Sequence, residues 1–294
     1  MKTDTKKERF YKEIRESLLA RGTNEMKITF RRVTKNNRKD LHAVLFELPD
    51  SKAAPTFYLE DLYKAYENGT SADDIADSLV NFAKQNRLGT IPGNIDLDDY
   101  DHAKRNLGLC VLGIERNREY LSDMVYEEHE DLALVPMIFT NDYHGPGHIK
   151  VRKDFLEMWN VTEEEVMRQA MENSPKLLPL TFRQLNDTGD HEPGEVCELF
   201  VISNAYFAGG AAVAFYPRVL ECIGMALGRD LFVLPSSINE MIVVTDTGQD
   251  PENLLSIVRE VNRTQVAPEE VLSDSVYYYN RKTDKLRKIL PAYA

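Results

Sequence analysis

The chain of 294 residues is longer than a minimal domain, and its hydrophobic fraction of 43% predicts a packed core and excludes general disorder. The net charge of −12 is unevenly distributed, because residues 1–39 hold 13 Lys and Arg against 5 Asp and Glu. Residues 281–294 are also basic, so the middle of the chain is strongly acidic. We therefore do not expect a nucleic-acid groove through the body of the protein, although the basic ends could still contact phosphate.

No stretch contains the roughly 18 consecutive apolar residues that a membrane span needs. The first 20 residues lack the apolar core of a signal peptide, so we expect a cytoplasmic protein that does not enter the membrane. The three cysteines, Cys110, Cys197 and Cys222, lie far apart and form no CxxC pair. They indicate neither a zinc site nor a disulfide framework, and we expect buried free thiols.

The first third of the chain predicts a helix, a hairpin and two more helices. Apolar residues recur every four positions in a predicted helix over 7–20, at Phe10, Ile14 and Leu18. Residues 26–33 alternate between apolar and polar side chains, and a polar turn separates them from the apolar run 41–48, which predicts a β-hairpin. Residues 54–69 begin extended and become helical, and Ser71 is placed to cap the next helix.

The middle of the chain predicts two buried strands over 105–114 and 131–140, followed by a tight turn, NDYHGPGH, over 141–148. A short strand and two helices then follow. Thr162 and Glu165 have the spacing of a capping box at the start of the second helix, and we expect Pro175 to end it.

The last third alternates between predicted strands and helices. Strands are expected at 197–203, 211–216, 230–235 and 240–246, and Gly209 and Gly210 are expected in a hairpin turn. Asp250 and Pro251 mark the start of a helix over 250–264. Two short strands over 275–280 and 285–290 predict a closing hairpin, in which Tyr277 and Tyr279 face one side and Tyr278 the other.

Strands and helices mix without a regular βαβ order, and hairpins recur. This pattern predicts an α+β fold with mixed, mainly antiparallel sheets and packed amphipathic helices. The loop over 87–99 is the best internal boundary, which divides the chain into an N-terminal part, 1–92, and a C-terminal part, 93–294. A single domain is the alternative.

Several long segments resemble an uncharacterised family of cytosolic proteins from clostridial gut bacteria. They include TFYLEDLYKAYENGTSADDI, FLEMWNVTEEEVMRQAMENSPKLLP, GGAAVAFYPRVLECIGMALGRD and EVNRTQVAPEEVLSDSVYYYNRKTDKL. The resemblance extends over nearly the whole chain. It implies no activity, because the family has no assigned function.

The sharpest metal candidate is the pair His144 and His148, with Asp142 adjacent and with His129 or His191 as a third ligand. Glycines and a proline between the two histidines exclude a helix, and no HExxH pattern is present, so an exposed polar turn is the preferred interpretation. Ser236 and Ser237 lack the G-x-S-x-G elbow of a hydrolase, and we expect them to cap a short helix. No catalytic residue or cofactor is predicted.

The leading hypothesis is therefore a non-enzymatic, macromolecule-binding or regulatory protein. Its basic first strand or helix beside an acidic body suggests a protein partner guided by charge, with Arg31, Arg32, Tyr277 and Tyr279 as candidate interaction residues. A hydrolase or metal-dependent enzyme is the first alternative, and a nucleic-acid-associated factor that uses the basic ends is the second. An exposed edge strand could also pair two copies of the chain.

Overall fold

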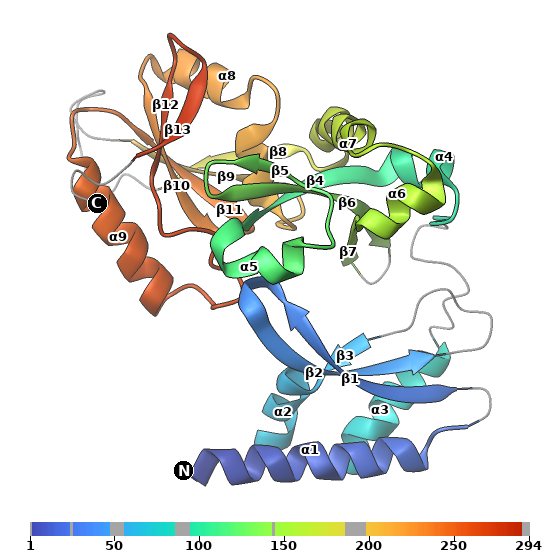
Figure 1. The fold of residues 1–294 in the computed structure, drawn as a ribbon. Coiled ribbons are helices and arrows are strands. Elements are labelled where there is room, and N and C mark those ends of the chain that lie inside the picture. The colour runs from blue at the N-terminus through green and yellow to red at the C-terminus, as the bar shows by residue number, and fades with distance from the viewer. Residues whose placement is uncertain are drawn as a thin grey trace. The chain divides into compact units, whose positions relative to one another are not determined.

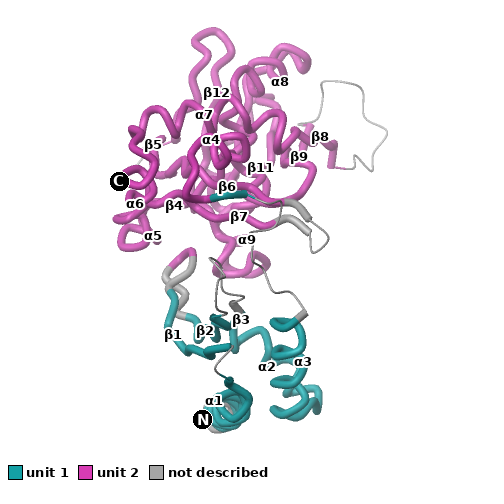
Figure 2. Tube along the Cα trace, turned by 90° about the vertical axis from the view of Figure 1, so that its right-hand side faces the viewer, with its two compact units in different colours: residues 1–35, 39–96 teal, residues 36–38, 97–294 magenta. Residues whose placement is uncertain are grey.

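The computed structural model describes residues 2–23, 26–47, 56–85, 95–142, 145–185 and 198–289. The chain forms two compact units (Figure 2). Unit 1 comprises Met1–Lys35 and Lys39–Asp96, and unit 2 comprises Asn36–Arg38 and Leu97–Ala294. Since compactness does not establish independent folding, the predicted division at residue 92 stays a prediction.

The described part of unit 1 contains three helices and a three-stranded antiparallel sheet with the order β1-β2-β3 (Figure 1). The strands are β1 (Lys27–Lys35), β2 (Lys39–Glu47) and β3 (Thr56–Tyr58). The helices are α1 (Lys2–Ala20), α2 (Leu59–Glu67) and α3 (Ala72–Gln85). The predicted hairpin and its flanking helices are confirmed.

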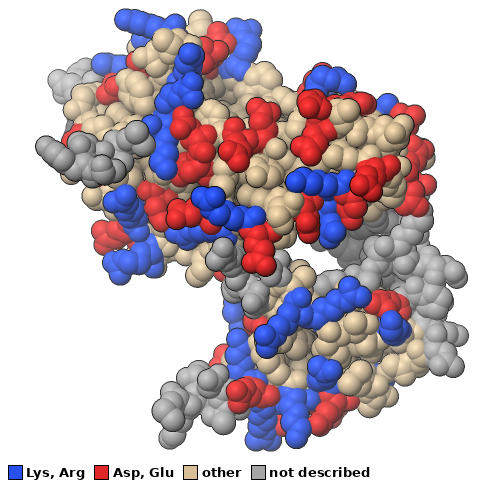
Figure 3. All heavy atoms as spheres, in the orientation of Figure 1, with Lys and Arg blue, Asp and Glu red and all other residues tan. Residues whose placement is uncertain are grey.

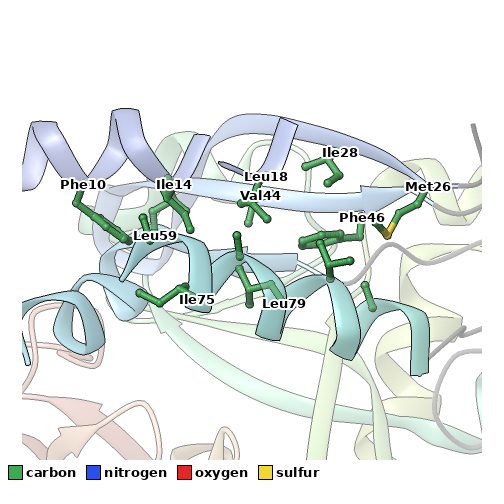
Figure 4. Close-up of a cluster of buried hydrophobic side chains, with 14 of the residues drawn as sticks. Phe10, Ile14, Leu18, Met26, Ile28, Val44, Phe46, Leu59, Ile75 and Leu79 are labelled. Carbon is green, nitrogen blue, oxygen red and sulfur yellow. The ribbon is translucent and has the colours of Figure 1, made fainter. Parts of the chain in front are cut away.

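The core of unit 1 lies between its helices and one face of its sheet (Figure 4). Phe10, Ile14 and Leu18 of α1 are completely buried, as their four-residue spacing predicts. They belong to one cluster with apolar residues of the sheet and the other helices, among them Val44, Phe46, Leu59, Ile75 and Leu79. The Ser71 hydroxyl accepts the Asp74 N–H at 3.1 Å, which confirms the predicted cap of α3.

Unit 2 contains two antiparallel sheets. In the smaller one, the long strand β6 (Leu132–Asp142) pairs on one side with β4 (Leu107–Gly113). On its other side it pairs with β5 (Glu127–His129) and β7 (Gly145–Lys150). The larger sheet has the order β13-β12-β10-β11-β9-β8. Its strands are β8 (Leu180–Gln184), β9 (Leu199–Asn204), β10 (Leu231–Ser237), β11 (Glu240–Thr245), β12 (Tyr277–Asn280) and β13 (Lys285–Lys288).

Helices connect and cover these sheets (Figure 1). They are α4 (Tyr100–Ala103), α5 (Ile114–Leu121), α6 (Lys153–Trp159), α7 (Glu163–Leu177), α8 (Val219–Leu227) and α9 (Pro251–Thr264). Short 3-10 segments are η1 (Asn36–Arg38), η2 (Lys104–Asn106) and η3 (Gly210–Phe215). The Thr162 and Asp250 side chains cap α7 and α9 as predicted. The α+β fold class with mainly antiparallel sheets is therefore confirmed.

The predicted strand over 211–216 is wrong, because η3 occupies this segment. Gly209 has a φ of 63° and turns the chain into η3 rather than into a hairpin. Residues 210–214 are buried on every side, so their sequence carries no alternation that would distinguish a strand from a helix.

Three other local predictions are also wrong. Pro175 lies inside the last turn of α7, where it removes one i→i−4 hydrogen bond, yet the helix continues to Leu177. The turn predicted over 141–148 is wrong from Gly145 onwards, because β7 (Gly145–Lys150) already begins there, whereas the short strand predicted after the turn is present. Ser236 and Ser237 end β10 instead of capping a helix. Among the cysteines, Cys110 is buried but Cys222 is exposed, and Cys197 lies outside the described residues.

We predict that Leu18→Ala destabilises unit 1 by about 2–5 kcal/mol, because it leaves a cavity in a closed core. Leu19→Ala is the matched control, since Leu19 is 52% exposed on the same helix. The loss of stability is measured as faster hydrogen exchange of backbone amides in peptides from α1 and α3. Equal effects of the two substitutions would contradict the position of this core.

Candidate functional site

Asp131 is the centre of a polar cluster in unit 2. It lies in the turn between β5 and β6, which the positive φ of Glu130 (58°) helps to close. Its Oδ1 accepts the Tyr277 hydroxyl at 2.5 Å, and its Oδ2 accepts the hydroxyls of Ser273 and Ser275 at 2.8 and 2.9 Å. The Lys288 Nζ lies 3.2 Å from Oδ2. One carboxylate thus binds four side chains that are at least 142 positions away in sequence.

The electrostatics of the cluster keep Asp131 ionised. Burial is the largest single influence and acts to raise its pKa. The hydrogen bonds from Tyr277, Ser273 and Ser275 and the charge of Lys288 together outweigh burial, and the pKa of Asp131 is lowered. Burial beside this carboxylate raises the pKa of Tyr277, so its hydroxyl stays protonated and continues to donate. The cluster is a saturated network rather than a proton-transfer pair.

A polar hollow of about 210 Å³ opens beside the cluster. Its walls come from the start of α5, from residues 272–275 and from side chains of α9 and β13. Arg116 donates to Asp274 at 2.6 Å across it, and Arg259 and Lys288 also line it. The hollow therefore combines cationic side chains with two carboxylates that already have donors, those of Asp131 and Asp274, and with the carboxylate of Glu115.

A second, less polar hollow of about 280 Å³ is lined mainly by apolar side chains of β6, η3, α8 and β13. His129, Arg218, Glu221 and Asp284 also lie at its wall. The His129 Nε2 is buried and has no hydrogen-bond partner, and burial lowers the pKa of this imidazole. The ring meets Phe215 edge to face at 5.0 Å. Among the described residues, no hydroxyl or thiol side chain forms a hydrogen bond with His129.

The predicted interaction tyrosines are buried. Tyr277 donates to Asp131, and the Tyr279 hydroxyl donates to Asp284 at 2.6 Å. Tyr278 faces the opposite side, as predicted, and donates to Asp246 at 2.7 Å. The closing hairpin is confirmed. The burial of Tyr277 and Tyr279 gives no support to their predicted contact with a partner, which stays a prediction.

Arg31 and Arg32 are exposed on β1, an edge strand of the sheet of unit 1. Arg31 lies 3.6 Å from Glu47, which Lys27 also contacts at 3.0 Å. The hydrogen bond from Lys27 lowers the pKa of Glu47. Arg32 has no ion-pair partner among the described residues and lies opposite His42 of β2. The outer edge of β1 therefore retains an excess of positive charge.

His42 is a residue that sequence reasoning missed. Its Nδ1 lies 3.0 Å from Glu60 Oε1, and the same carboxylate oxygen accepts the Tyr11 hydroxyl at 2.8 Å. Burial acts to raise the pKa of Glu60, but the bonds from His42 and Tyr11 outweigh it and the pKa is lowered. Glu60 of α2 orients the imidazole of His42 of β2. The sequence alone does not indicate that this helix packs against this strand.

The basic C-terminal segment is largely paired within unit 2. Arg281 contacts Asp230, Arg287 contacts Glu130, and Lys288 contacts Asp131. On the face drawn in Figure 3, Lys and Arg alternate with Asp and Glu over unit 2. Lys282 and Lys285 of the same segment are exposed, and the contact of the basic ends with nucleic acid stays a prediction.

The predicted metal pair cannot be examined as a pair, because His144 lies outside the described residues, as does His191. His148 is exposed on β7, with its Nε2 at 3.4 Å from Lys150 Nζ, and His129 lines the less polar hollow. Within the described ranges, no group of three or more His, Cys, Asp or Glu is arranged to hold a metal ion. The metal site stays a prediction.

Comparison with protein families identifies a match over residues 7–281 to a family of unknown function, DUF5688. The chain belongs to this family. The resemblance to an uncharacterised family is thus confirmed, whereas a clostridial origin and a cytosolic location stay predictions. No curated protein and no solved structure matches the chain. In the part of the chain that the structure describes, none of the helices has the length and apolarity to cross a bilayer.

We predict that Asp131→Asn destabilises unit 2 by about 2 kcal/mol at pH 7, because it leaves Lys288 and the hydroxyl donors without their carboxylate. The folded pKa of Asp131 lies below its unfolded value of about 3.9, so its contribution is present above that pH and is lost as the pH falls through the folded pKa. The difference between wild type and variant should therefore shrink towards pH 3.

Urea unfolding followed by the fluorescence of Trp159, which is buried in unit 2, measures this difference. Asp123→Asn is the control, since Asp123 is exposed. A loss of stability that does not change with pH would show that the negative charge of Asp131 is not what stabilises the cluster.

Proposed function

We propose that this protein is a non-enzymatic binding protein, in which the outer edge of β1 takes up an acidic, extended segment of a protein partner. The observation that carries the proposal is the combination of an edge strand of nine residues with exposed cationic side chains. Lys27 and Arg31 have side chains that are 76% and 62% exposed. The cytoplasm as the place of action belongs to the same proposal.

The main chain of an edge strand can accept a further strand, because half of its N–H and C=O groups point away from its neighbour. In the described part of unit 1, β2 is the strand that pairs with β1, and the other edge of β1 has no strand beside it. Backbone hydrogen bonds would therefore supply affinity without any requirement for a deep pocket.

Charge would supply the selectivity. Lys and Arg on an edge strand oppose edge-to-edge aggregation and repel basic segments. The same side chains attract an acidic strand. Lys27 and Arg31 share one carboxylate, that of Glu47, and Arg32 has no ion-pair partner among the described residues. In Figure 3, Lys and Arg side chains run across the sheet of unit 1. An incoming carboxylate would complete pairs that the fold leaves open.

Fluorescence anisotropy with a labelled peptide of alternating Glu and Thr tests the proposal. We expect binding at low salt that weakens with ionic strength, and a loss of about tenfold in Arg31→Ala/Arg32→Ala, since two exposed pairs contribute roughly 1.4 kcal/mol. Lys282→Ala/Lys285→Ala is the control, because these two exposed lysines lie on the β12–β13 hairpin of unit 2.

The same peptide with N-methylated backbone amides distinguishes strand addition from simple attraction of charge, because it retains the carboxylates but cannot donate backbone hydrogen bonds. We expect it not to bind. Equal binding of the methylated peptide, or no effect of the arginine substitutions, would refute this function.

A further inference from the structure

The polar hollow beside Asp131 contains more hydrogen-bond donors than the protein uses. It is a partly open hollow in unit 2 with a volume of about 210 Å³, and it is lined by three cations from three elements: Arg116 of α5, Arg259 of α9 and Lys288 of β13. Cations that converge from separate elements are a common way of holding an anionic group.

Two of the acids that line the hollow are already occupied. Asp131 accepts three hydroxyls and contacts Lys288. Asp274 accepts the Asn262 amide at 2.8 Å through Oδ1 and Arg116 at 2.6 Å through Oδ2. Both carboxylates therefore serve the fold, and they compete weakly for the remaining donors of the cations.

The cations have donors to spare. A guanidinium carries five N–H groups and an ammonium three, yet Arg116 uses its Nη2 on Asp274 and Lys288 has its contact with Asp131. Arg259 is exposed and has no ion-pair partner among the described residues. Since protein oxygens do not accept all of these N–H donors, an oxyanion fits the hollow.

The start of α5 adds a smaller contribution. Gly113 is its N-cap and provides no side-chain hydrogen bond, and a Cβ at this position would lie 2.2 Å from the Leu272 carbonyl oxygen. The segment that forms the wall thus packs closely on the helix start, where the backbone dipole favours negative charge. Glu115 of the first turn opposes this effect, because its exposed carboxylate has no ion-pair partner among the described residues.

We propose that this hollow binds the phosphate group of a small molecule, held by Arg259, Arg116 and Lys288. Because Asp131 and Asp274 already pair with Lys288 and Arg116, the spare N–H donors of the cations, and not a net positive charge, would hold the ligand. These donors converge from three elements, which suits the three terminal oxygens of a phosphate monoester better than the two oxygens of a carboxylate. The site is separate from β1, and it does not depend on the proposed strand addition.

Isothermal titration of the full chain with methyl phosphate, at low and constant ionic strength, tests this site. Wild-type protein should bind one equivalent saturably. Arg259→Gln should weaken binding about tenfold, and Glu115→Gln should tighten it several-fold, because it removes the one carboxylate at the hollow without a partner. Arg263→Gln, one turn further along α9 and outside the hollow, is the matched control and should change nothing.

Acetate titrated in the same way should bind at least tenfold more weakly than methyl phosphate. The proposal is overturned if wild-type protein shows no saturable binding, or if Arg263→Gln weakens binding as much as Arg259→Gln. It is also overturned if Glu115→Gln leaves the affinity unchanged or if acetate binds equally well. All three substituted residues are exposed, and circular dichroism establishes that each variant is folded.

Discussion

The ionised carboxylate of Asp131 is the constraint on which the architecture of unit 2 depends. A buried charge costs several kcal/mol unless it is paired and hydrogen-bonded. Asp131 belongs to the turn of the smaller sheet, whereas its four partners lie in the segment that ends the larger sheet. Satisfying this one group therefore joins the two sheets and fixes where the last hairpin lies.

The three consecutive tyrosines follow from the same constraint. Their rings alternate between the two faces of β12, and each hydroxyl reaches a different carboxylate, on Asp131, Asp246 and Asp284. Tyrosine suits these positions, because the ring packs among apolar neighbours while the hydroxyl serves as a donor. Some of the acidic side chains of the chain therefore accept hydrogen bonds from hydroxyl groups inside unit 2, and they are not free to contact a partner.

Local signals in the sequence were sufficient for most elements. The spacing of Phe10, Ile14 and Leu18 defines α1, and Asp250 with Pro251 defines the start of α9, because each signal lies within a few residues. Prediction failed at η3, where burial on all sides removes the periodicity. It also failed for the Asp131 cluster, since Ser273 lies 142 positions from Asp131 and pairs with it only through the tertiary fold.

The distribution of paired and unpaired cations separates stability from function in this protein. Arg281, Arg287 and Lys288 neutralise acids of their own unit, so the basic end of the chain is part of the fold. Arg32 and Arg259 have no such partner among the described residues. An exposed arginine without a partner adds little to stability, because surface pairs contribute at most about 1 kcal/mol even when they form. Folding therefore constrains Arg32 and Arg259 little. An anionic ligand that pairs with each guanidinium would give both residues a function.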